Sequence, residues 1–168
     1  MATEEPNNRM NGVEGCLACD LTTGRALLPG GVIFESDGWL VEDCIGPLGV
    51  GTLIVKPRRH VERFVDLEPD EFGAFGRVVW LATATLRDLL SPDQTYVCGW
   101  AHAGWTPGHI HFVVQPVWNS DGRQHPRPGP FLQVEMFTAN ESPSPDGVAE
   151  FCDRARQVIQ SLAGERSA

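Results

Sequence analysis

Polar and apolar residues alternate most regularly between positions 108 and 116, where the sequence is GHIHFVVQP. Alternation with a period of two is typical of a strand with one face in the core and the other facing a site. The inward set is expected to be Ile110, Phe112 and Val114, and the outward set His109, His111, Val113 and Gln115. Two imidazoles two residues apart then lie roughly 7 Å from each other along the strand. Taken alone, a His-x-His pair is more often part of a half-buried strand than of a site.

Shorter apolar runs predict five further strands, and sequences such as Asp37-Gly38 supply turns suited to an antiparallel meander. The predicted strands span 32–35, 39–45, 51–56, 95–100 and 131–137.

Two stretches carry apolar residues at spacings of three and four and predict amphipathic helices. The first begins near Glu68, with Pro69 at the first helical position. The second begins where Ser144 can cap a helix and Pro145 can start it. A meander, a central helix, more strands and a C-terminal helix predict an α+β fold with a mainly antiparallel sheet of about five or six strands.

The length of 168 residues suits one domain, which we place at 15–162, with a disordered lead over 1–14 and a flexible tail over 163–168. The lead has neither the basic nor the apolar region of a signal peptide, and no apolar run is long enough to span a bilayer. We therefore expect a cytoplasmic protein with no membrane partner.

A formal net charge of −9 argues against nucleic acid as a partner, because no uniformly basic surface exists to release counterions. One basic group interrupts the acidic chain, and it either binds a phosphate or is simply solvated. It consists of Lys56, Arg58, Arg59 and Arg63.

Cys16 and Cys19 form a Cys-x-x-Cys pair, which is either half of a zinc site or a redox dithiol. The redox interpretation requires the start of a helix after a buried strand, and the pattern around these residues predicts neither. Two unrelated thiols are the remaining alternative. Five cysteines in a cytoplasmic protein favour metal or thiol chemistry over disulfides.

Three blocks, in this order, make the chain resemble the histidine-triad (HIT) superfamily of nucleotide hydrolases and transferases, which includes relatives of the galactose-1-phosphate uridylyltransferases. They are the Cys-x-x-Cys pair, the strand and basic segment 51–60 that ends in His60, and the segment 104–116. The resemblance implies a HIT-like fold and one bound Zn²⁺. The implied ligands are Cys16, Cys19, His60 and His109. Two thiolates and two imidazoles fill a tetrahedral shell, so this zinc is expected to be structural.

The resemblance further implies that His111 is the nucleophile, which attacks the α-phosphorus of a nucleotide and forms a nucleotidyl-histidine. Thr106 matches a hydroxyl position that serves the leaving group or phosphate. Gly104 and Gly108 allow backbone amides to approach phosphate oxygens. The expected substrate is a dinucleoside polyphosphate, a nucleoside phosphoramidate or a compound similar to a nucleotide sugar. A homodimer is also implied by resemblance.

The chain departs from the family pattern at several positions. Val113 stands where a third histidine is usual, and Gln115, one strand period further along, is expected to take over part of its role in substrate binding. Cys44 stands at the usual ribose-binding aspartate, with Asp43 beside it on the opposite strand face. These departures leave two functions open: a nucleotide hydrolase or nucleotidyltransferase, and a catalytically silent nucleotide-binding protein that retains the zinc scaffold.

Overall fold

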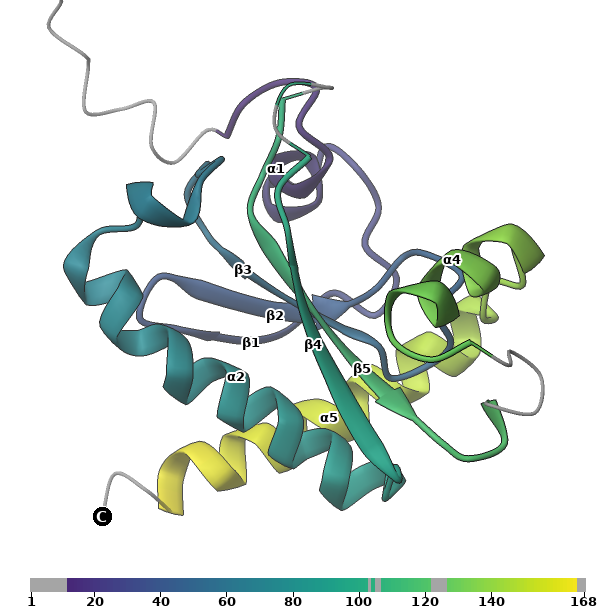
Figure 1. Ribbon diagram of the computed structural model, residues 1–168. Coiled ribbons are helices and arrows are strands. Elements are labelled where there is room, and N and C mark those ends of the chain that lie inside the picture. Colours follow the sequence, from purple (N-terminus) through teal and green to yellow (C-terminus); the bar gives the residue numbers. More distant parts are fainter. Residues whose placement is uncertain (1–11, 103, 105–106, 122–126, 166–168) are drawn as a thin grey trace, which may run out of the picture.

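Five strands form one antiparallel sheet in the order β1-β2-β3-β5-β4 (Figure 1). The fold is described from a computed structural model for residues 12–102, 104, 107–121 and 127–165. The strands are β1 (Val32–Ser36), β2 (Trp39–Asp43), β3 (Leu53–Pro57), β4 (Gln94–Trp100) and β5 (His111–Val117). The predicted α+β class and antiparallel sheet are confirmed, because every pairing between neighbouring strands is antiparallel.

Two long helices, α2 (Pro69–Leu90) and α5 (Pro145–Glu165), cover one face of the sheet. A capping box between Glu68 and Glu71 starts α2, and the Ser144 hydroxyl accepts a hydrogen bond from the Gly147 amide at the start of α5. The core lies between these helices and the strands. It includes Trp39, Val41, Val55 and Val114 from the sheet and Leu81, Leu86, Phe151 and Ile159 from the helices.

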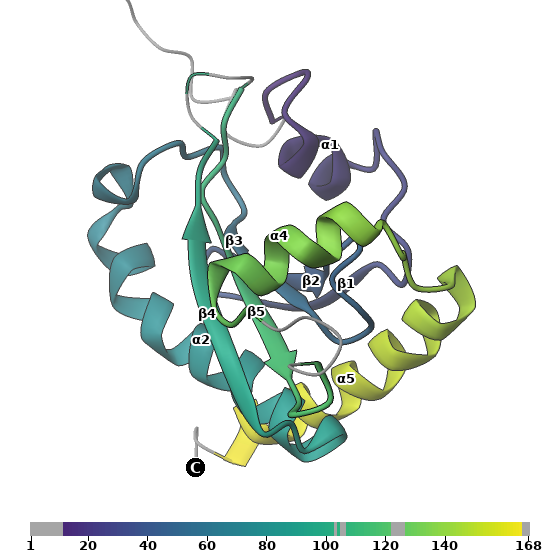
Figure 2. The ribbon, with the colours of Figure 1, turned by 45° about the vertical axis from the view of Figure 1, so that its right-hand side comes forward.

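The predicted strand at 131–137 is wrong, because these residues lie in α4 (Pro130–Ala139). Leu132 and Gln133 are buried, whereas Phe131, Val134 and Phe137 are exposed, which is the spacing of a helix rather than of a strand. A short apolar run does not separate the two structures by its composition, and Pro130 at the first helical position favours the helix. Figure 2 shows α4 passing in front of the sheet.

The helix α1 (Leu17–Thr23), which the sequence did not predict, lies near the end of the sheet where β5 begins (Figure 1). The helix α5 continues to Glu165, three residues beyond the predicted end of the domain. Of the predicted lead, only residues 12–14 belong to the described part of the chain. Within that part, no helix combines the length and the apolar character needed to cross a bilayer.

Candidate metal centre and active site

The structure brings Cys16, Cys19, His60 and His109 together, and one ligand atom from each lies within 4.8 Å of all the others. Cys16 is the N-cap of α1 and Cys19 lies in its first turn, His60 follows β3, and His109 precedes β5. Segments that are distant in sequence therefore meet at one point. The pair of cysteines does lie at the start of a helix, contrary to expectation, although no strand precedes it among the described residues from 12 onward.

The distances in this cluster fit a tetrahedral zinc ion. Zn–S bonds of about 2.3 Å and Zn–N bonds of about 2.0–2.1 Å at tetrahedral angles place sulfur and nitrogen roughly 3.6 Å apart. The Nδ1 atom of His109 lies 3.6 Å from each of the two sulfurs. The Nδ1 atom of His60 lies 3.5 Å from the sulfur of Cys19. The four donors thus have the chemistry and the spacing of a closed Cys₂His₂ site.

The surroundings of His109 fix the proton on one ring nitrogen and keep the ring neutral, as a metal ligand requires. Its Nε2 lies 3.0 Å from the carbonyl oxygen of Pro57. A carbonyl only accepts hydrogen bonds, so Nε2 carries the proton and Nδ1 keeps its lone pair for a metal. Burial, the largest effect, lowers the pKa of His109 to about 4 and keeps the ring neutral. Burial raises the pKa of the Cys19 thiol to about 11, and a bound cation would offset this by stabilising the thiolate.

A cavity of about 500 Å³ opens beside the metal cluster, and His111 lines it. The Nδ1 atom of His111 donates to the backbone carbonyl of His109 across 2.9 Å, which leaves the lone pair on Nε2. Burial is the largest cause that lowers the pKa of His111, so its ring is neutral. A neutral, oriented imidazole in the wall of a cavity can act as a nucleophile.

His102 lines the same cavity and was missed by the sequence reasoning. Its ring centroid lies 5.3 Å from that of His111, and its backbone has φ 54°, which is uncommon for a residue other than glycine. It lies two residues after the end of β4, where no periodic pattern points to a site. A histidine just past a strand end was the available signal, as it was for His60.

The four residues predicted to bind the substrate do not all line the cavity. Gly108 is buried and lines the cavity. Gly104 has φ 87° and open space around its Cα, but it is not among the described residues that line the cavity. Thr106 lies outside the described residues. Gln115 is buried beneath α4, where its side-chain oxygen accepts a hydrogen bond from Gln133 at 3.1 Å, and it does not line the cavity.

Only part of the outward face of β5 therefore lines the cavity. Val113 is 5% exposed and packs against Cys44, Leu48 and Met136 rather than facing the cavity. The helix α4 covers this end of the face, because the sulfur of Met136 also accepts a hydrogen bond from Gln115 at 3.2 Å.

The strand β2 and the residue after it contribute three polar groups to the cavity wall, namely Glu42, Asp43 and Cys44. Glu42 forms an ion pair with Lys56, which also lines the cavity. Burial raises the pKa of Asp43 to about 7, against the opposing effect of a hydrogen bond from the Gly51 amide. The other three members of the basic group pair with carboxylates elsewhere: Arg58 with Glu35, Arg59 with Glu71 and Arg63 with Asp66.

Two uncharacterised HIT-like proteins are similar to this chain in sequence, whereas no family model matches it. One, from Methanocaldococcus jannaschii, is 29% identical over 108 residues, which cover 64% of this chain and 82% of that protein. The other, from Saccharolobus solfataricus, is 24% identical over 108 residues, covering 63% and 76% of the two chains.

Solved structures share the fold. A hypothetical histidine triad nucleotide-binding protein from Sulfolobus tokodaii superposes with a TM-score of 0.66 at 17% identity, covering 88% of this chain and 93% of that one. A zinc-bound histidine triad family protein from Mycobacterium smegmatis gives a TM-score of 0.64 at 21% identity, covering 89% and 96%. The sequence relatives, the shared fold and the motif residues gathered at one site support the histidine-triad (HIT) superfamily as the family of this chain.

Proposed function

We propose that this protein is a nucleotide hydrolase or nucleotidyltransferase that works through a covalent nucleotidyl-His111 intermediate. One observation carries the proposal. The His111 ring is fixed by the His109 carbonyl, is kept neutral by burial, and lines a cavity of about 500 Å³. Such a cavity has the size of a small-molecule site. The relatives with structures include one described as nucleotide-binding, which supports a nucleotide as the ligand.

In the first step, the Nε2 lone pair of His111 forms a bond to the α-phosphorus, and the bond from phosphorus to the leaving-group oxygen breaks. His102, whose ring lies 5.3 Å from that of His111, donates a proton to that oxygen. In the second step, water or another acceptor attacks the phosphorus, neutral His102 takes its proton, and the P–N bond electrons return to His111. The backbone amide of Gly108 holds a phosphate oxygen, since the amides of His109 and Ile110 donate to the carbonyls of Ala101 and Val61.

The metal in this proposal is Zn²⁺, held by Cys16, Cys19, His60 and His109. It supplies structure rather than an activated water, since the protein fills all four positions. The chain's own contribution is the backbone link from His109 to His111, which lets an ordered cluster position the nucleophile.

The test of the function is to trap the intermediate. Protein incubated with a nucleotide substrate is quenched in base, and mass spectrometry is expected to locate one nucleotidyl group on His111. The His111→Ala variant is expected to form no adduct and to lose turnover while its circular dichroism and metal content stay unchanged. Undiminished turnover in that variant would refute the proposal.

The second candidate is a catalytically silent nucleotide-binding protein. Val113 favours it, because the usual third histidine is replaced by a residue buried in an apolar cluster. Calorimetry separates the two functions: the silent protein binds nucleotides without turnover, and turnover of any nucleotide in a broad panel excludes it.

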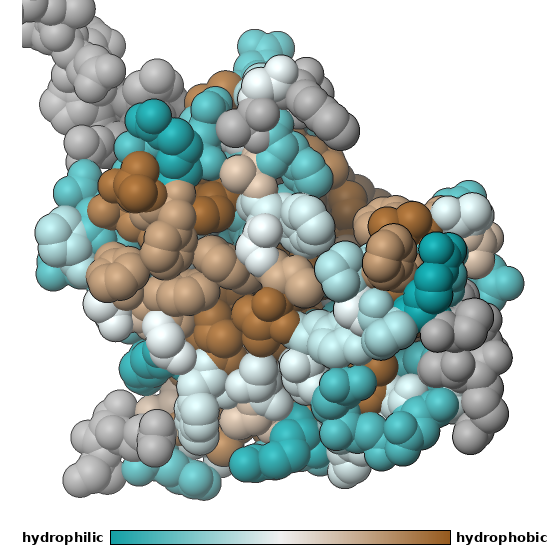
Figure 3. Space-filling model, viewed as in Figure 1, coloured by the Kyte–Doolittle hydropathy of each residue, from teal (hydrophilic) through white to brown (hydrophobic). Residues whose placement is uncertain are grey.

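We also propose a cytoplasmic homodimer. The edge strand β4 exposes Val97 and Trp100, and apolar side chains gather between β4, the first half of α2 and the short 3₁₀ helix η2 (Phe64–Asp66) (Figure 3). An open edge with exposed apolar residues is suited to pairing with a second copy. Light scattering of the wild-type protein is expected to give twice the mass of one chain. The Val97→Lys variant is expected to give the mass of a single chain.

We propose the cytoplasmic location because a reducing compartment would keep the thiols of Cys16 and Cys19 available for a metal.

A further inference from the structure

The helix α1 carries two of the four metal ligands but packs only lightly against the other helices and strands. Its residues Leu17, Ala18 and Leu21 line the cavity, as do residues of the sheet, so the cavity lies between part of this helix and the sheet. Among the described residues, none of the extensive contacts between pairs of elements involves α1. Residues 24–31, which form neither helix nor strand, connect it to β1. Packing against other elements therefore contributes little to the positions of the two cysteine sulfurs.

A buried ammonium group links α1 to the sheet. The Nζ atom of Lys56 in β3 donates to the carbonyl oxygen of Ala18 across 2.8 Å. In the sequence, Ala18 lies between the two ligands Cys16 and Cys19. The same carbonyl also accepts a hydrogen bond from the Thr22 hydroxyl across 2.8 Å, so it has a partner within its own helix. The contact from Lys56 is thus an additional link, which joins α1 to β3.

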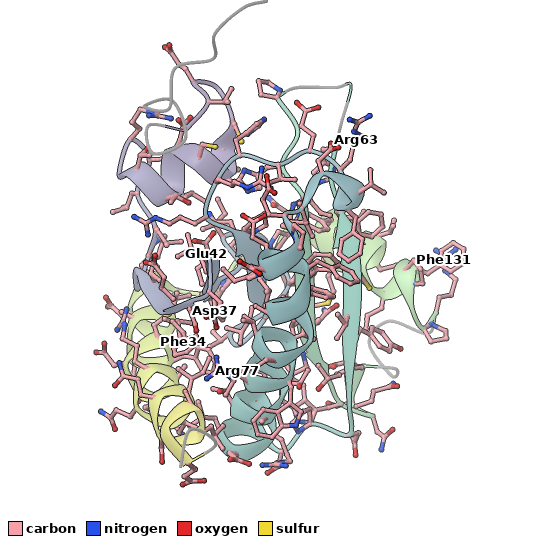
Figure 4. All side chains as sticks on the ribbon, turned by 90° about the vertical axis from the view of Figure 1, so that its left-hand side faces the viewer. Phe34, Asp37, Glu42, Arg63, Arg77 and Phe131 are labelled. Atoms are coloured by element: carbon pink, nitrogen blue, oxygen red, sulfur yellow. The ribbon has the colours of Figure 1, made fainter. Side chains whose placement is uncertain are left out.

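Glu42 in β2 holds Lys56 in place. Its Oε1 atom lies 2.7 Å from Nζ of Lys56, and the two side chains are 2% and 0% exposed. In Figure 4, Glu42 lies inside the molecule below α1. Replacement of a buried ion pair by apolar residues is often neutral or even stabilising, so the stability of the fold is a poor explanation for this pair. A fixed ammonium group below α1 does, however, give the link to Ala18 a defined position.

The strand β3 also positions the other half of the metal centre. Its last residue, Pro57, accepts a hydrogen bond from Nε2 of His109 across 3.0 Å, and His60 follows three residues later. With the link from Lys56 to Ala18, the end of β3 therefore reaches both the histidines and the helix that carries the cysteines. Groups that hold metal ligands in this way commonly change metal affinity by 10–100-fold when they are removed.

We propose that Lys56, fixed by Glu42, positions the Cys-x-x-Cys pair for metal binding through the carbonyl of Ala18. Lys56 is a positioning residue and not a ligand, because an ammonium group has no lone pair. Without the link, α1 is free to shift, and the two sulfurs are no longer held 3.6 Å from Nδ1 of His109. The metal then binds more weakly and leaves faster. This inference rests on the metal centre of the proposed function and not on its nucleotide chemistry.

The experiment measures the zinc affinity of the full-length protein by competition with a chromogenic chelator, and the rate of zinc transfer to an excess of that chelator. The variant Glu42→Leu combined with Lys56→Met removes both charges together and keeps similar side-chain volumes. It is expected to bind zinc 10–100-fold more weakly than the wild-type protein and to release it faster. The matched control, Glu35→Gln combined with Arg58→Gln, removes an exposed ion pair next to the end of β3 and is expected to keep the wild-type affinity.

Unfolding in urea of the chelated protein separates positioning from a purely structural role. The metal-free double variant is expected to be at least as stable as the metal-free wild-type protein, since both buried charges are removed together. A purely structural role predicts the opposite pattern, with a less stable metal-free protein and unchanged zinc affinity. Lys56→Met alone is the second variant, because burial raises the pKa of Glu42 and allows its carboxyl group to stay neutral without the ammonium group. It is expected to show the same loss of affinity.

Wild-type zinc affinity in both the double variant and Lys56→Met overturns the inference, as does an equal loss in the control. Loss of the fold in both variants would assign the pair to stability and would overturn it as well. If the wild-type protein binds no zinc, the metal centre of the proposed function fails and the inference fails with it. The nucleotidyl-His111 adduct is measured separately, so its absence contradicts the proposed reaction and not the role of Lys56.

Discussion

The backbone carbonyl of His109 accepts a hydrogen bond from Nδ1 of His111, and the ring of the same His109 belongs to the metal cluster. One residue thus serves the structural site with its side chain and the reacting group with its backbone. The Nε2 atom of His109 is in turn held by Pro57 at the end of β3. The orientation of the proposed nucleophile therefore depends on the order of the cluster, although the metal contacts no reacting atom in the proposed mechanism.

Removal of the metal is expected to destabilise the whole domain. The purified protein should hold one zinc per chain, and chelation should lower the melting temperature by roughly 5–15 °C, because the bound ion stabilises only the folded state. Cys16→Ser and His60→Ala should lose the metal. Cys98→Ser is the control, since Cys98 lies away from the cluster under α4, 3.7 Å from Gln133. Full metal content in Cys16→Ser and His60→Ala would contradict the assignment.

The proton donor role of His102 is tested by changing the leaving group. His102→Asn keeps a residue that tolerates the φ of 54° and removes the imidazole. Turnover of a substrate with a poor leaving group should fall by roughly 10²–10⁴-fold, the usual contribution of a general acid. Turnover of a p-nitrophenyl ester, which needs no proton donor, should change little. An equal loss with both substrates would assign His102 to binding or to structure instead.

Restoring the third histidine of the family motif is expected to destabilise this protein without increasing turnover. Val113→His would place an imidazole among Cys44, Leu48 and Met136 beneath α4. Burial of a polar ring without a partner should reduce the free energy of unfolding by about 1–3 kcal/mol, measured by denaturation in urea. Turnover should not increase, because position 113 does not line the cavity. A stable and faster Val113→His variant would show that α4 moves aside in solution.

The stability of the protein should depend on the ionisation of Asp43. Its pKa is raised to about 7 by burial, between the large cavity and a smaller one of about 70 Å³. Below about pH 4 the carboxyl is protonated in both the folded and the unfolded state, so it carries no penalty. As the pH rises from 4 to 7, the unfolded chain ionises while the folded protein keeps the proton, and stability falls. The loss is on the order of 4 kcal/mol and is complete above about pH 7.

The variant Asp43→Asn removes this dependence and should be more stable than the wild-type protein at pH 8. Asp37→Asn is the control, because Asp37 lies exposed in the turn before β2 and faces Arg77 at 3.3 Å (Figure 4). Unfolding free energies at pH 4.5, 6 and 8 measure the difference. A constant difference between Asp43→Asn and the wild-type protein across this range would show that Asp43 ionises normally.

Periodicity predicted the parts of the fold in which one face of an element is buried. The meander β1 to β3, the helices α2 and α5 and the strand β5 have strong patterns and end within a few residues of their predicted limits. The residues 131–137 were misassigned because a short apolar run fits both a strand and a helix. The short helix α1 lacks a periodic pattern, and contacts that are distant in sequence, through Cys16 and Cys19 in the metal cluster and from Lys56 to Ala18, help to fix its position.

The site was predictable only where the chain resembles a family motif. The resemblance to the HIT superfamily implied the four residues that the structure brings together, and the chemistry of two thiolates and two imidazoles agreed with that set. The pair Glu42 and Lys56 was not predicted, because it depends on the register of β2 with β3. Lys56 lies opposite Leu40, and Glu42 lies opposite Ile54, so the two charges meet only diagonally across the sheet. The cover that α4 places over Val113 and Gln115 likewise depends on packing that no local pattern reports.

The segment at the end of β3 contributes to both the cavity wall and the metal cluster. Within five residues it supplies Lys56 to the cavity wall, the Pro57 carbonyl to His109, and His60 to the cluster. A shift of this segment would disturb ion binding and the shape of the cavity at once. Protein stripped of its ion should consequently lose affinity for a ligand in the cavity before it unfolds, so that affinity would report how much of the protein is loaded.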